Sequence, residues 1–285
     1  MNPVKRKSYR SIIIACSATL AAATTTASGE ESGSSAFRVC ADPNNLPFSN
    51  RARAGFEDKL AEIIAVDLSR PLEYVWHPQR RAFIRNTLKA GMCDAVMGVP
   101  AELGTVTASR PYYRSTYVFV YRPDHGLDGL SSLRDHRLKD VSIGVQLIGD
   151  DGYNTPPAHA LSAQGIVDNL VGYTIYGDYR EPNPPARIVE AVAAGAVDVA
   201  AVWGPLAGYF APREIVPLTL APITDTAEYK PLLFQYDIAV GVRKGDEALK
   251  TRIDAALDRH RLEIKHLLQS YGVPLVAEDG TVARN

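Results

Sequence analysis

Hydrophobic positions after residue 36 alternate between short apolar runs, typical of strands, and three-to-four-residue spacings, typical of helices. Strands are predicted at 37–41, 72–76 and 94–99. A helix with one apolar face begins near Phe56, and a shorter helix ends at Gly91 before the third strand. This β-α-β-α-β order predicts an α/β fold in which a mostly parallel sheet is flanked by helices.

A repeated unit of helix, turn and strand predicts a second lobe. The sequence Ala-Gly-x-Cys-Asp-Ala-Val at 90–96 is echoed by Ala-Gly-x-Val-Asp-Val-Ala at 194–200. In both copies a glycine ends a helix, and a buried strand then carries the chain to a cleft. Two such units indicate two similar lobes.

Two strands are predicted to connect these lobes, one at 116–121 and one at 234–242. The apolar spacing from Leu249 to Leu268 predicts one long amphipathic helix that packs back on the first lobe. The predicted limits are 36–122 together with 240–285 for lobe 1, and 123–239 for lobe 2.

Residues 1–27 have the anatomy of a secretory signal peptide. The apolar run at 12–23 is shorter than the roughly 20 residues that a membrane-spanning helix needs. A lipoprotein processed at Cys16 and an uncleaved anchor are the alternatives. We therefore expect a cleaved leader, a periplasmic location and no membrane attachment of the mature chain. Basic residues precede the apolar run: Lys5, Arg6, Lys7 and Arg10.

Composition and charge narrow the class of protein. The chain has 285 residues, 46% of them hydrophobic and 22% charged, which excludes disordered, collagen-like and multi-span membrane proteins. Its net charge of −1 becomes −5 when the four basic residues of the leader are removed. Without a basic run to follow a phosphate backbone, nucleic acid is not an expected partner.

The cysteines support export. Cys16 is removed with the leader, so Cys40 and Cys93 remain in an oxidising compartment. Both lie in strand-like segments, and adjacent parallel strands would bring them within bridging distance. We expect a disulfide between them; two separate buried thiols are the alternative.

Candidate binding residues lie near the ends of predicted strands, where open α/β sheets bind ligands. A turn packed over Phe48 explains the group after strand 37–41 equally well. The loop at 149–155 either caps a helix that begins near Pro156 or contacts a partner. The candidates are Asp42, Asn44, Phe48, Pro100, Glu102, Tyr112, Tyr113, Arg114, Asp150, Asp151, Asn154 and Trp203.

Signatures of common enzyme classes are absent from the sequence. It has no Gly-x-Ser-x-Gly, no His-Glu-x-x-His, no phosphate-binding glycine loop and no EF-hand spacing. Its six histidines never pair at helical spacing. We therefore predict neither catalysis nor a metal site nor a cofactor of its own.

Five stretches, in order, resemble the MxaJ/XoxJ-type accessory proteins of quinoprotein methanol dehydrogenases. They are 40–49, 76–81, 93–100, 149–157 and 203–210. The segment Ser109-Arg110-Pro111-Tyr112-Tyr113 resembles a motif of the wider superfamily. The resemblance covers about 36–280 and implies the two-lobed type II periplasmic binding protein fold.

Two charges of ordinary amino-acid receptors are missing. In those receptors, an arginine seven residues before the motif serine binds the ligand carboxylate, and that position here is Glu102. An acidic residue five places after the repeated aspartate binds the ligand ammonium, and that position here is Trp203. A carboxylate ligand would lose a strong bidentate contact unless Arg110 or Arg114 replaced it.

The resemblance implies a monomeric, non-catalytic accessory protein that binds a methanol or alcohol dehydrogenase, or a segment of it, during maturation or activation. That enzyme would carry pyrroloquinoline quinone (PQQ) with a lanthanide or calcium, and its cytochrome is a further candidate partner. The alternatives are a solute receptor of an ABC importer and an enzyme of the cyclohexadienyl dehydratase type on the same fold.

Overall fold

The computed structural model describes residues 35–80, 82–123, 125–147, 154–174, 179–277 and 279–282. The chain divides into two units, 1–33 and 34–285, and every described residue belongs to the second. The expected leader and the candidates Asp150 and Asp151 lie outside the described residues. Within these ranges, no helix combines the length and apolar character needed to cross a bilayer.

Lobe 1 is built on three parallel strands, which confirms the β-α-β-α-β prediction. β1 (Phe37–Ala41) lies between β4 (Leu72–Trp76) and β5 (Ala95–Pro100). α1 (Phe56–Asp67) connects β1 to β4, and α2 (Phe83–Asn86) connects β4 to β5. Short strands complete this part of the chain: β2 (Asn44–Asn45), β3 (Ser49–Asn50) and β6 (Thr107–Ala108).

Lobe 2 contains the second copy of the repeat. α4 (Arg187–Ala193) is followed by β10 (Val199–Trp203), which pairs parallel with β8 (Ile143–Leu147). Its other elements are α3 (Pro156–Ala163), β9 (Leu170–Thr174), α5 (Gly204–Phe210), β11 (Thr219–Pro222) and the 3-10 turns His136–Lys139, Pro184–Ala186, Ala211–Arg213 and Thr226–Tyr229.

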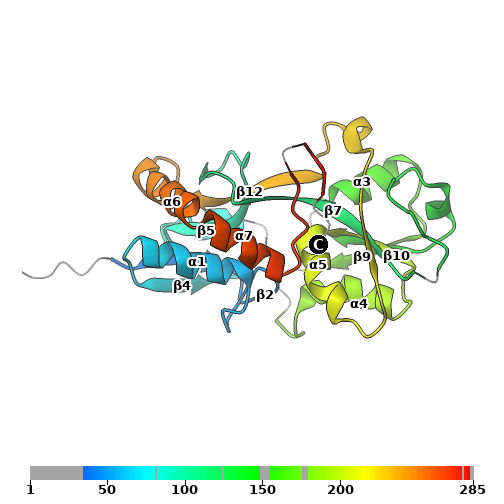
Figure 1. Ribbon diagram of the computed structural model, residues 1–285, viewed down its shortest axis with the longest axis horizontal. Coiled ribbons are helices and arrows are strands. Elements are labelled where there is room, and N and C mark those ends of the chain that lie inside the picture. The colour runs from blue at the N-terminus through cyan, green and yellow to red at the C-terminus, as the bar shows by residue number, and fades with distance from the viewer. Residues whose placement is uncertain are drawn as a thin grey trace, which may run out of the picture. The chain divides into compact units, whose positions relative to one another are not determined.

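Two long strands join the lobes into one sheet. β7 (Tyr113–Tyr121) and β12 (Gln235–Val242) pair antiparallel, and the strand order is β4-β1-β5-β12-β7-β10-β8-β9 (Figure 1). Along β7, Tyr113 belongs to the core of lobe 1, whereas Tyr117 belongs to that of lobe 2. The two connecting strands therefore pass from one core to the other. The lobe limits near 122 and 240 stay a prediction.

The predicted long C-terminal helix is wrong, because the structure has two helices. α6 (Glu247–Arg259) ends and α7 (Arg261–Ser270) begins at His260, whose side chain lies 3.3 Å from Asp67 and 2.8 Å from Glu263. The break allows both helices to pack on α1 (Figure 1).

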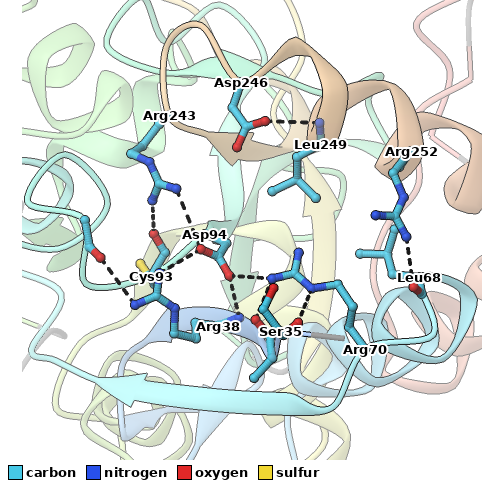
Figure 2. Close-up of polar contacts among 12 residues, drawn as sticks. Ser35, Arg38, Leu68, Arg70, Cys93, Asp94, Arg243, Asp246, Leu249 and Arg252 are labelled. Carbon is cyan, nitrogen blue, oxygen red and sulfur yellow. Dashed lines mark hydrogen bonds and ion pairs between the residues drawn. The ribbon is translucent and has the colours of Figure 1, made fainter. Parts of the chain in front are cut away.

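Asp94 connects the N-terminal ends of the three parallel strands of lobe 1. It accepts hydrogen bonds from the Arg38 backbone and side chain at 3.0 and 2.9 Å and from Arg70 at 3.1 Å, and Arg243 lies 3.6 Å away (Figure 2). Burial alone would raise the pKa of Asp94, but these hydrogen bonds and positive charges outweigh it and lower the pKa. The expected disulfide between Cys40 and Cys93 is confirmed, with the Cα atoms 5.6 Å apart.

Candidate functional site

Asp42 lies directly after β1, but the chain's own groups occupy its oxygens. The residue is only 1% exposed; Oδ1 accepts the backbone N–H of Asn44 at 2.8 Å, and Oδ2 accepts that of Gln79 at 2.6 Å. The Tyr179 hydroxyl of lobe 2 lies 3.5 Å from both oxygens. Burial raises the pKa of Asp42. An incoming ligand would therefore compete with contacts that already exist.

The loop after Asp42 also contacts lobe 2. Asn44 donates its side-chain amide to the carbonyl of Glu181 at 2.9 Å, and Leu46 packs against the core cluster that contains α4 and α5. Phe48 packs edge to face on Phe56 with ring centroids 5.4 Å apart. Phe48 is thus placed as a packing residue, whereas Asn44 bridges the two lobes.

A small acidic cavity lies beside Asp42, and sequence reasoning missed its main residues. The cavity is lined by Ser49, Glu57, Asp58 and Tyr74 and has a volume of about 10 Å³, about the room that one water needs. Among the described residues, no group of three or more His, Cys, Asp or Glu could hold a metal ion.

Asp58 and Glu57 have strongly raised pKa values. Asp58 Oδ2 accepts the backbone N–H groups of Asn50 and Gly55, each at 3.0 Å, while its Oδ1 has no partner. Burial raises the pKa of Asp58 to about 6. Burial and the charge of Asp58 raise the pKa of Glu57 to about 8. The spacing of Gly55 and Asp58, a helix-capping pattern, was the available sequence signal.

Trp203 lies at the carboxyl end of β10, between the two cores. Its ring makes edge contacts with Tyr117 at 5.2 Å and Tyr236 at 5.8 Å, and its backbone N–H donates to Gln146 at 2.7 Å. Burial and the negative charge of Glu102 raise the pKa of Tyr236. Tyr236, which sequence reasoning missed, therefore lies near Glu102 and Trp203, the two positions that the resemblance aligns with charged residues of amino-acid receptors.

Arg110 and Arg114, the two arginines that could replace the missing receptor arginine, both contact acidic residues of this chain. Arg110 turns to α6, where its side chain pairs with Asp258 and its backbone N–H donates to Asp254 at 2.7 Å. Arg114 lies on β7, 3.9 Å from Asp237 and 3.3 Å from the amide oxygen of Gln235. A ligand carboxylate would have to compete with Asp237 for Arg114.

The other candidates lie in the lobe 1 core or in backbone pairs between neighbouring segments. Tyr112 approaches Glu57 Oε1 at 3.5 Å, and Tyr113 packs on Phe56 with ring centroids 6.0 Å apart. Pro100 pairs with Ile238 in the β5–β12 ladder. Asn154 bridges to Leu147 before α3. The structure thus brings Glu102 and Trp203 together near Tyr236, whereas the register of β7 and β12 places the Arg114 side chain on the other face of the sheet. Separately, it groups Asp42, Asn44 and Tyr112 with the acidic cavity.

Comparisons with known proteins agree with this architecture. Residues 37–273 match the family described as bacterial extracellular solute-binding proteins, family 3. Protein MoxJ of Methylorubrum extorquens AM1 is 33% identical over 252 residues, which cover 84% of this chain and 81% of that protein.

Two solved structures are similar over the whole of their length. The periplasmic binding protein XoxJ of Methylobacterium extorquens AM1 has 34% identity and a TM-score of 0.69, covering 85% of this chain and 100% of that one. MxaJ of Methlophaga aminisulfidivorans MPT has 28% identity and a TM-score of 0.70, covering 84% and 100%. The chain therefore belongs to family 3 of the bacterial extracellular solute-binding proteins, and within it to the MxaJ/XoxJ type.

Proposed function

We propose that this protein is a non-catalytic periplasmic accessory protein of a PQQ-dependent methanol or alcohol dehydrogenase. It would bind a polypeptide segment of the enzyme during maturation or activation. The observation that carries the proposal is the pair Glu102 and Trp203 near Tyr236, at the positions where amino-acid receptors hold a charged ligand. PQQ and its metal ion would belong to the dehydrogenase.

The chemistry of these residues favours a polypeptide over a zwitterionic solute. A free amino acid needs a cation and an anion at fixed positions, and here Arg114 is already paired with Asp237. Trp, Tyr and Arg are the residues that dominate the energetics of protein interfaces. Trp203, Tyr117 and Tyr236 form an aromatic group of this kind on adjacent strands.

The test is titration of purified apo-dehydrogenase with this protein by calorimetry, combined with an activity assay during reconstitution. We expect stoichiometric binding that weakens at least tenfold in Trp203→Ala. Trp76→Ala is the matched control, because Trp76 stacks on Tyr74 in lobe 1, with ring centroids 4.6 Å apart. Absence of both binding and any effect on activity would refute the proposal.

The alternative is a receptor that delivers a solute to an ABC importer, which membership of a solute-binding family also fits. Its signature would be tight binding of one small molecule per chain, accompanied by closure of the lobes. Calorimetry with periplasmic extracts freed of protein separates this outcome from dehydrogenase binding.

A further inference from the structure

Residues 271–276, which we call the brace, connect the lobes outside β7 and β12. The brace leaves α7, and its Val273 is fully buried in the core of lobe 1. Its other side lies against α5 of lobe 2. The chain therefore passes between the lobes through β7 and β12, and the brace is a third segment that contacts both lobes.

The contact between the brace and α5 is made by backbone. A Cβ atom added at Gly208 would overlap the carbonyl oxygen of Gly272, and one added at Gly272 would overlap that of Gly208. Gly272 also has a φ of +70°, which favours glycine. One turn earlier, a Cβ atom at Gly204 would lie 2.6 Å from Pro274. No side chain larger than hydrogen fits at Gly208 or Gly204 without displacing the brace.

Hydrogen bonds fix the brace to β7 between the two cores. The hydroxyl of Ser115, a fully buried residue, donates to the carbonyl of Pro274 at 2.7 Å. The N–H of Val276 donates to the carbonyl of Arg114 at 2.9 Å. Because buried polar groups are costly to leave unpaired, moving the brace would be unfavourable.

Tyr271 joins helices of both lobes. Its ring stacks on Tyr209 of α5 at 5.6 Å and meets Phe56 of α1 edge to face at 5.8 Å. Its hydroxyl donates to the carbonyl of Ala54 at 2.7 Å. Opening the lobes at this point would separate an aromatic pair and expose both rings.

We propose that the brace holds the two lobes in one arrangement without any ligand. Contacts of Asn44 with Glu181 and of Leu46 with the lobe 2 core support the same arrangement from the loop after β1. A solute receptor that opens and closes would have to break these contacts in each cycle.

Distance measurement between the lobes tests the brace. Spin labels at Val66→Cys and Ile215→Cys use side chains that are 78% and 99% exposed, one on each lobe. Cys40 and Cys93 are paired, and a Cys16→Ser background removes the remaining thiol of the full chain. Pulsed electron resonance without ligand should give one narrow distance distribution.

Two variants should broaden that distribution, namely Gly208→Ala and Tyr271→Ala. Gly104→Ala is the matched control, because an added Cβ there meets no atom within 4 Å, and it should leave the distribution unchanged. If Gly208→Ala fails to fold, the comparison of Tyr271→Ala with Tyr271→Phe, which keeps the stacked ring, replaces it.

The proposal fails if the parent already shows two or more distances, or if a mixture of amino acids shifts them. It also fails if folded Gly208→Ala and Tyr271→Ala keep the parental distribution. Because the measurement uses this chain alone, it is independent of whether a dehydrogenase binds.

Discussion

Replacing Glu57 with glutamine should change how the stability of this protein depends on pH. Burial and the neighbouring charge of Asp58 raise the pKa of Glu57 from 4.5 to about 8. Between these values the folded protein keeps a proton on Glu57 that the unfolded chain has lost. The free energy of unfolding contributed by Glu57 is therefore largest below about pH 4.5, falls as the pH rises, and is lost above about pH 8.

The size of the effect follows from the two pKa values. Their difference of about 3.5 corresponds to about 5 kcal/mol across the window. This is an upper bound, because the side chain keeps some solvent exposure and water screens its charge. Glutamine keeps the shape and the acceptor for the Tyr112 hydroxyl but cannot ionise. Relative to wild type, Glu57→Gln should therefore gain about 2–5 kcal/mol between pH 5 and pH 9.

Urea denaturation at pH 5, 7 and 9 measures this difference. Asp58 and Asp42, whose pKa values are also raised, remain in both proteins. Their contributions to the pH dependence of the free energy of unfolding therefore cancel in the comparison. Glu73→Gln, an exposed change on β4, is the control for removing one carboxylate from the surface. A constant difference between Glu57→Gln and wild type from pH 5 to pH 9 would refute the reasoning.

Three further predictions concern the disulfide, Asp94 and Gly98. Cys93→Ser should lower the free energy of unfolding by about 2–5 kcal/mol, and an unchanged urea midpoint would contradict this. Asp94→Asn should cost about 1–3 kcal/mol at pH 7; because the pKa of Asp94 is lowered, its thermal melts should approach those of wild type as the pH falls below 3.8. Gly98→Ala should destabilise more than Gly91→Ala, since both have positive φ but only a Cβ at Gly98 overlaps Glu57; equal urea midpoints would exclude that contact.

Much of the fold was predictable because it depends on local spacing. The strand at 37–41 and the repeat at 194–200 follow from short apolar runs and helix-ending glycines, and the structure confirms both. The break at His260 was not predictable in this way. Leu257 and Ile264 are seven residues apart and fit an uninterrupted helix, so the apolar spacing continues across the break.

The site was predictable only in part, because the residues that contact its candidate side chains come from distant parts of the chain. Asp42 follows a strand, as expected, but Tyr179 and Gln79 reach it from elsewhere in the fold. Tyr236 lies between Trp203 and Glu102 through the pairing of β12 with β7, which no local pattern specifies. Contacts of this kind depend on the three-dimensional fold.

Restoring the two missing charges should not by itself restore an amino-acid site. In Glu102→Arg with Trp203→Asp, the new carboxylate would lie beside Tyr117 and Tyr236, and Asp42 would still accept the backbone N–H of Gln79. We therefore expect no binding of arginine or glutamine tighter than about 1 mM by calorimetry, with circular dichroism and the single Glu102→Arg variant as checks on folding. Micromolar binding by the folded double variant would show that charge alone, rather than the packing around Asp42 and Tyr236, separates this chain from amino-acid receptors.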